Sequence, residues 1–215
     1  MDRKEKAAKV LDILEKEFPD PRTALEFKNP LELLIATILS AQATDKLVNK
    51  VTETLFRKYR TAKDYGASQT LEEDISSINF YRNKAKNIKA CCARLISEHG
   101  GKVPDTLEEL TELPGVGRKT ANIVLGNAFG KDALAVDTHV KRVSQRLGLT
   151  DADDPDRIEA DLTSVIPPKR WTKTTHLFIL HGRKTCKAVN PDCEHCPIQA
   201  YSIYYKEVFS KKKRR

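Results

Sequence analysis

The sequence has little of what marks a membrane, secreted or disulfide-rich protein. No apolar run is long enough to span a bilayer, and the opening MDRKEKAAKV is charged rather than apolar, unlike a signal peptide. The five cysteines are an odd number, which argues against a complete disulfide framework. We therefore predict a soluble cytoplasmic protein, whose 215 residues suffice for one large domain or two small ones.

Sustained alternation of apolar and polar residues, the pattern of a half-buried strand, is also missing. Helical periodicity and helix-terminal residues recur instead, with no detectable repeat or low-complexity linker. The expected amino-terminal caps are Asn29 with Pro30, Thr44, Thr70 with Glu73, Thr106 with Glu109, Asp137, and Asp154 with Pro155, and the expected stops are Gly100 and Gly148. The sequence therefore predicts an all-α protein with short connections.

Positive charge exceeds negative charge, with 38 Lys and Arg against 30 Asp and Glu and a net charge of +8. Such a balance favours a polyanionic partner, either nucleic acid or an acidic membrane surface, although a basic solvated surface would explain it equally well. Residues 81–94 carry Arg82, Lys84, Lys86, Lys89 and Arg94 without an acidic residue among them. We expect Lys84 and Lys86 to contact phosphates, whereas the basic tail 211–215 is more typical of a disordered end.

The stretch LPGVGRKTA, residues 113–121, places a proline and two glycines between two expected helices. Glycine lets backbone N–H groups approach a ligand without a Cβ in the way, and consecutive N–H groups at a helix start bind anions such as phosphate. Proline and glycine also punctuate many ordinary helix–helix turns. The stretch alone therefore leaves both a phosphate site and a plain turn open.

Three further motifs accompany this turn: LSAQATD at 39–45, AVDTH at 135–139 and the spacing C-x6-C-x2-C near the carboxyl end. Together they resemble endonuclease III, of the helix-hairpin-helix family of base-excision DNA glycosylases with a lyase activity, over about residues 27–205. The resemblance implies two helical lobes with a DNA cleft between them. Residues 22–132 would form a six-helix lobe with the hairpin, and residues 1–21 with 133–215 an iron–sulfur-type lobe. It also implies a monomer that acts on double-stranded DNA with oxidised pyrimidines or abasic sites.

The resemblance assigns roles to individual residues. Lys119 matches the family's nucleophile and Asp137 its catalytic carboxylate. Gln42 matches a residue that fills the gap left by the expelled base, and Phe80 lies where the family has an apolar wedge. Main-chain amides of the hairpin would hold the DNA backbone, and the remaining expected contacts and pocket residues are Pro114, Gly115, Val116, Gly117, Arg118, His139 and Asp45. Taken singly, each has a plainer interpretation, such as an exposed helix lysine, a helix cap or a core phenylalanine.

The cysteines depart from the family's pattern. The family binds a [4Fe–4S] cluster with C-x6-C-x2-C-x5-C, and Cys186, Cys193 and Cys196 match it, but the fourth position is Ser202. A serine hydroxyl is a poor substitute for a soft thiolate on iron. Three outcomes stay open: a four-iron cluster with oxygen or water on one iron, a three-iron cluster, or none. Zinc with His195 as a ligand is a weaker possibility. The pair Cys91 and Cys92 lies in a helical pattern, where we expect buried thiols.

Two rival functions follow from the same motifs. Monofunctional adenine or mismatch glycosylases of this superfamily lack the hairpin lysine, so Lys119 argues against them. A non-catalytic hairpin module would bind DNA but would not need Asp137 or LSAQATD. We therefore expect a bifunctional glycosylase and abasic-site lyase.

Overall fold

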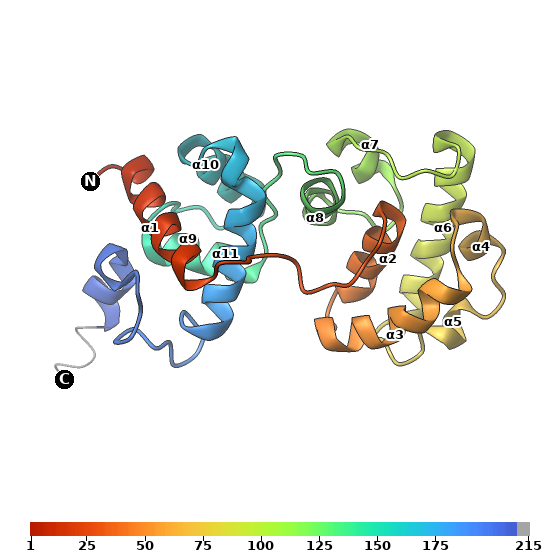
Figure 1. Cartoon of the computed structure of the whole chain (residues 1–215), viewed down its shortest axis with the longest axis horizontal. Helices are drawn as coiled ribbons and strands as arrows, with labels where there is room; N and C mark the ends of the chain where they lie inside the picture. The colour runs from red at the N-terminus through yellow and green to blue at the C-terminus, as the bar shows by residue number, and fades with distance from the viewer. Residues whose placement is uncertain (210–215) are drawn as a thin grey trace. The chain divides into compact units, whose positions relative to one another are not determined.

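The computed structural model describes residues 1–209 and divides the chain into two compact units (Figure 1). One unit contains Thr23–Lys131, and the other joins Met1–Arg22 to the chain from Asp132 onward. Within residues 1–209 the regular structure is helical and no strand occurs, so the all-α prediction is confirmed. No helix in this part of the chain is both long and apolar enough to cross a membrane. The predicted basic tail, 211–215, lies outside the described residues, and the predicted cleft between lobes stays a prediction.

The unit Thr23–Lys131 has seven helices. One of them, α5, is a single turn of four residues, and without it the number is the six that the resemblance implied. Its helices are α2 (Pro30–Ser40), α3 (Asp45–Lys58), α4 (Ala62–Ala67), α5 (Leu71–Asp74), α6 (Tyr81–His99), α7 (Leu107–Glu112) and α8 (Arg118–Ala128). Residues 33–39 of α2 are all buried, since α3, α6 and α8 pack around it (Figure 1).

The other unit has a separate core built from α1 (Arg3–Glu17), α9 (Thr138–Leu147), α10 (Pro155–Val165) and α11 (Trp171–Lys184). The segment 133–136 is buried beside α11, where Thr175 binds both backbone groups of Ala135 and Thr172 donates to Ala133 O. These hydroxyls satisfy backbone groups that a strand would otherwise have to pair. The segment therefore leads to α9 in a fixed conformation.

Most of the predicted helix ends are confirmed. Asn29, Thr44, Thr106, Asp137 and Asp154 each accept a backbone N–H of the following turn, and Gly100 and Gly148 end their helices in the left-handed conformation.

The prediction of a capping box at Thr70 is wrong. Its hydroxyl does not cap α5 and instead bonds Lys58 Nζ at 2.7 Å and Asp74 at 3.2 Å. Charge-assisted hydrogen bonds are stronger than a neutral cap, so the network with Lys58 and Asp74 prevails. A complete capping box does form at Thr61 and Asp64, which the sequence analysis did not identify.

Candidate functional site

The hairpin joins α7 to α8 through residues 114–117, and its two glycines differ in what the fold asks of them. Gly115 has φ +78°, and a Cβ there would lie 2.8 Å from Asn87 Cβ on α6. Gly117 has φ −90°, and no atom lies within 4 Å of where its Cβ would be. Val116, between them, is buried and its N–H bonds Leu113 O at 3.0 Å. Gly115 is therefore required by the fold, whereas Gly117 is not.

The start of α8 is arranged for an anion. Gly117 supplies no side chain to cap the helix, and the first turn contains no acidic residue. The N–H groups of a first turn carry the positive end of the helix dipole. Arg118 and Lys119 are exposed at this end, as the first two residues of α8. The predicted nucleophile thus follows directly after an uncapped helix start.

Asp137 caps α9 in the other unit. Its Oδ1 accepts the N–H groups of His139 and Val140, both at 2.8 Å, and the side chain is half-buried. The structural role foreseen for it is confirmed, and its catalytic role stays a prediction. Both cap bonds use Oδ1, which leaves Oδ2 as a second oxygen that can accept a proton.

His139 lies where α9 packs against α11. Its Nδ1 is 3.0 Å from Arg142 Nη2, and because a guanidinium only donates, this contact is a hydrogen bond in the tautomer whose Nδ1 is unprotonated. Arg142 also donates to Gly182 O at 3.0 Å. Burial, together with the Arg142 and Arg183 cations, lowers the pKa of His139 despite the opposing effect of Asp137. These contacts give His139 a packing role, and the DNA contact expected of it stays a prediction.

Gln42 and Phe80 are brought together although 38 positions separate them in the chain. Asn79 donates from Nδ2 to Gln42 O at 3.1 Å, so the turn after α2 lies beside the start of α6. Both predicted DNA contacts are exposed, Phe80 by 62%, and both have left-handed backbones, with φ 55° at Gln42 and 58° at Phe80. Such conformations cost about 1–3 kcal/mol each and cluster at functional sites. Asp45, the first residue of α3, is half-buried just beyond this turn.

The expected phosphate contact of Lys84 is wrong. Its side chain is only 6% exposed, and Nζ donates to Leu39 O at 2.8 Å and to Ala41 O at 2.5 Å. Burial lowers the pKa of Lys84. The cause is its place on the buried face of α6, which it shares with Ile88, Cys91 and Leu95. Lys86 lies on the exposed side of the same helix, and its phosphate contact stays a prediction.

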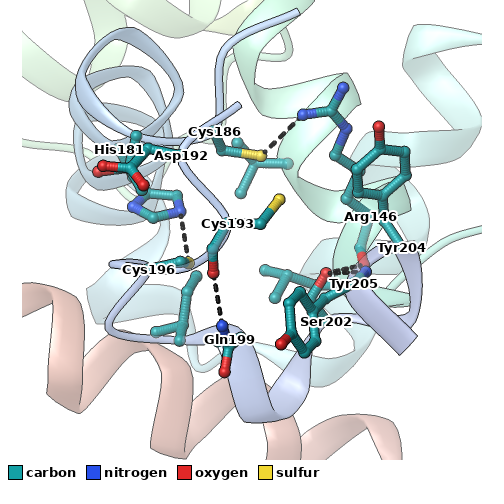
Figure 2. Close-up of a pocket in the computed structure, with 14 residues that line it drawn as sticks. Arg146, His181, Cys186, Asp192, Cys193, Cys196, Gln199, Ser202, Tyr204 and Tyr205 are labelled. Atoms are coloured by element: carbon teal, nitrogen blue, oxygen red, sulfur yellow. Dashed lines mark hydrogen bonds between the residues drawn. The ribbon is translucent and has the colours of Figure 1, made fainter. Parts of the chain in front are cut away.

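Cys186, Cys193 and Cys196 line one pocket, together with Ser202, Arg146 and His181 (Figure 2). Arg146 Nη1 donates to Cys186 Sγ at 3.3 Å, and His181 Nε2 lies 3.7 Å from Cys196 Sγ. Burial raises the pKa of the Cys196 thiol to about 11. His181 Nδ1 is buried and has no hydrogen-bond partner within residues 1–209.

Ser202 and His195 are both engaged elsewhere. Ser202 Oγ donates to Arg146 O at 3.2 Å and accepts from Tyr205 N at 3.1 Å. The side chain of His195 is 82% exposed and bonds Asp192 at 2.8 Å. Within residues 1–209, no group of three or more His, Cys, Asp and Glu side chains is placed to hold a single metal ion. This argues against the zinc alternative. The expected burial of Cys91 and Cys92, in α6, is confirmed.

Comparisons with known proteins agree with these motifs. Residues 35–168 match the family model described as HhH-GPD superfamily base excision DNA repair protein, and residues 186–201 match the iron–sulfur binding domain of endonuclease III. Endonuclease III of Synechocystis sp. is 51% identical over 199 residues, which cover 91% of each chain. That of Escherichia coli K12 is 41% identical over 208 residues, 95% of this chain and 98% of the other.

The chain belongs to the endonuclease III family. A solved structure of a trapped endonuclease III–DNA covalent intermediate is 50% identical, with a TM-score of 0.91 and full coverage of both chains. A thermostable thymine-DNA glycosylase, at 24% identity and a TM-score of 0.84, shows only the same fold. As a member of the endonuclease III family, the chain is a DNA glycosylase and abasic-site lyase of base excision repair that contains an iron–sulfur binding segment.

Proposed function

We propose that the chain, as a monomer, removes oxidised pyrimidines from double-stranded DNA and cleaves 3′ to the abasic site, with Lys119 as the nucleophile. The observation that carries this assignment is the place of Lys119, exposed on the second residue of a helix whose start is uncapped. A phosphate bound by the first-turn N–H groups would put a nearby sugar within reach of the amine. The relative trapped covalently on DNA supports a nucleophile of this kind.

Base release and strand cleavage need an amine nucleophile and a group that transfers protons. The Lys119 amine attacks C1′ of the flipped nucleotide, the C1′–N bond breaks, and the base leaves with a proton. Ring opening gives a Schiff base, loss of a C2′ proton expels the 3′ phosphate, and water then releases the lysine. By the family resemblance Asp137 would be the acid–base group of this reaction: its carboxylate form would stabilise positive charge on the sugar, and Oδ2, which makes neither cap bond, would be the oxygen that takes up a proton in the proton-transfer steps. The two N–H groups on Oδ1 hold the carboxylate in place.

Borohydride trapping on abasic and thymine-glycol duplexes tests the assignment. We expect Lys119→Gln to bind DNA but to lose both the trapped complex and strand cleavage, because an amide cannot form a Schiff base. Lys102→Gln, which changes another exposed lysine of the same unit, should trap like the wild type. Normal strand cleavage by Lys119→Gln would refute the role of Lys119, and cleavage of abasic but not thymine-glycol DNA would refute the lesion class.

We further propose that Cys186, Cys193 and Cys196 hold a cluster with water or hydroxide on its remaining iron. The three cysteines line one pocket, and they lie in or at the start of the segment 186–201 that matches the iron–sulfur binding domain of endonuclease III, which supports a cluster. An iron-bound thiolate has no proton, so His181 Nε2 would donate to Cys196 and Nδ1 would be the bare nitrogen, in accord with its lack of a partner. Ser202 Oγ accepts the N–H of Tyr205, three residues further on, as a helix-capping hydroxyl does, and it donates to Arg146 O. These hydrogen bonds support a capping role for Ser202 rather than a role as an iron ligand. Because no step of the lyase chemistry transfers an electron, we expect catalysis not to depend on the redox state of the cluster.

Iron and sulfide assays on anaerobically purified protein, with electron paramagnetic resonance after mild oxidation, test the three-thiolate site. We expect iron and sulfide in the wild type and a three-iron signal after oxidation, because water holds the exposed iron weakly. Ser202→Cys should suppress that signal. Protein that is free of iron yet folded and active would show that the loop is held by packing alone.

A further inference from the structure

Three side-chain hydrogen bonds connect the end of α2 and the turn after it to the start of α6, and they come from Lys84 and Asn79 rather than from the side chains of Gln42 and Phe80. Lys84 Nζ donates to Leu39 O and Ala41 O, at the carboxyl end of α2. Asn79 Nδ2 donates to Gln42 O at 3.1 Å. The backbone of Lys84 also contacts the loop that precedes α6, because its N–H bonds Phe80 O at 3.1 Å. One residue thus bonds carbonyls on both sides of the contact.

Burial of Lys84 is costly, because within residues 1–209 its ammonium bonds only to carbonyl oxygens. In the part of the chain that the structure describes, no carboxylate pairs with this lysine, so its ammonium is desolvated without compensation and burial lowers its pKa. An apolar side chain would pack on this face of α6 at less cost. What the ammonium adds is a cation at the end of the α2 dipole, where the last carbonyls lack helical partners.

The backbone of the two loops is the part of the unit that most needs such support. Gln42 and Phe80 are two of the three non-glycine residues with positive φ among residues 1–209. Left-handed backbones of this kind persist only where surrounding contacts determine them. The carbonyls that Lys84 and Asn79 bind belong to Ala41 and Gln42, on both sides of the Gln42 Cα, and the Phe80 carbonyl is bound by the first turn of α6.

We propose that Lys84 and Asn79 are positioning residues that fix the spacing and direction of Gln42 and Phe80, so that these side chains enter the DNA as one rigid pair. This inference rests on the proposed function for its DNA step. The gap filler and the wedge must act at the same moment, when the damaged base leaves the stack. A fixed pair meets the DNA in the right geometry without ordering two loops separately.

A double-mutant cycle on single-turnover base release from a thymine-glycol duplex tests the coupling. We expect Lys84→Met, which keeps the length of the side chain, to slow base release by about 10-fold or more, since displacements near 1 Å can cost about 100-fold. In a background that carries both Gln42→Ala and Phe80→Ala the same change should slow release by less than about 2-fold, because both positioned side chains are already gone. Asn79→Ala, at an exposed position, should behave in the same way and guards against a Lys84 variant that does not fold. If Lys84→Met and Asn79→Ala slow base release by the same factor with and without the positioned side chains, the proposal is wrong, because general destabilisation acts independently of those side chains.

Amide hydrogen exchange without DNA separates this proposal from the proposed function. The Ala43 amide, which bonds Ser40 O across the turn, should exchange faster in Lys84→Met and in Asn79→Ala. It should be unchanged in Lys50→Met, which alters an exposed lysine of α3. Unchanged exchange in both loop variants would overturn the bracing itself, whatever the activity. If the wild type fails to act on either duplex, the proposed function fails while exchange still reports on the bracing.

Discussion

The same substitution at the two hairpin glycines should have opposite consequences. For Gly115→Ala, the left-handed backbone costs an L-residue about 1–2 kcal/mol, and the new methyl would lie 2.8 Å from Asn87 Cβ. That Cβ is fixed to the α6 backbone, so relief requires movement of the helix, and overpacking of this kind costs about 1–3 kcal/mol more. We therefore expect Gly115→Ala to lower the free energy of unfolding by about 2–5 kcal/mol.

For Gly117→Ala the fold offers no such penalty. Its φ of −90° suits any residue and the methyl would meet no atom within 4 Å, so only the weaker capping tendency of alanine remains, below about 1 kcal/mol. If the hairpin amides bind a DNA phosphate, however, the methyl stands where the phosphate must approach. We expect affinity for abasic-site DNA to fall about 10-fold or more, the equivalent of one lost contact of about 1.4 kcal/mol.

Urea unfolding followed by far-ultraviolet circular dichroism, with equilibrium binding to abasic DNA, checks both halves. Circular dichroism is preferred because the single tryptophan, Trp171, lies outside the unit that carries the hairpin. Wild-type affinity in Gly117→Ala would refute the phosphate grip. Equal losses of stability in the two variants would refute the distinction drawn from their geometry.

Three further outcomes are expected. Asp137→Asn should keep α9, since asparagine caps as well as aspartate, yet slow base release by about 100-fold or more; an unchanged single-turnover rate would make Asp137 a cap alone. In the dependence of DNA affinity on salt, Lys86→Met should reduce the logarithmic slope by about 0.9, whereas buried Lys84→Met should leave it unchanged; equal slopes for both would place the DNA elsewhere. Burial lowers the pKa of His176 to about 4, so the folded state prefers the neutral ring and loses stability as the pH falls from 6.5 toward 4, by on the order of 2–3 kcal/mol. His176→Gln should remove that part of the pH dependence of urea unfolding, and an identical pH profile would contradict it.

The sequence predicted what depends on local chemistry and missed what depends on contacts between distant segments. Asn29 and Asp137 cap their helices because a cap involves only the next turn. Lys84 was predicted to be an exposed cation, because a run of positive charge does not show which residues of a helix face the core. Its spacing from Ile88 and Cys91 nevertheless matches the buried stripe of α6. Its partners near Gln42 lie 45 and 43 positions away, beyond any local pattern.

The pocket residues Arg146 and His181 were missed for the same reason. They reach the cysteines from α9 and α11, and no spacing in the chain announces those contacts. The left-handed backbones of Gln42 and Phe80 also have no sequence signal, because residues other than glycine rarely adopt them. Gln42 and Phe80 therefore break the backbone preferences of their residue types at positions where a function is expected. Functional sites are where such exceptions concentrate.

The start of α8 departs from a local rule in a way that predicts a trade between stability and function. Lys119 lies at the positive end of a helix dipole, in a first turn that contains no acidic residue, where a carboxylate would stabilise the helix. A phosphate bound at this helix start would place a negative charge beside Lys119, so DNA would offset the unfavourable position of this lysine. Lys119→Gln should therefore raise the free energy of unfolding, by about 0.3–1 kcal/mol at low ionic strength, and 0.5 M salt should screen much of the gain. Lys102→Gln, away from any helix start, should leave stability unchanged. Urea midpoints at both salt concentrations decide the matter, and a Lys119→Gln variant less stable than the wild type would show that this lysine supports the fold.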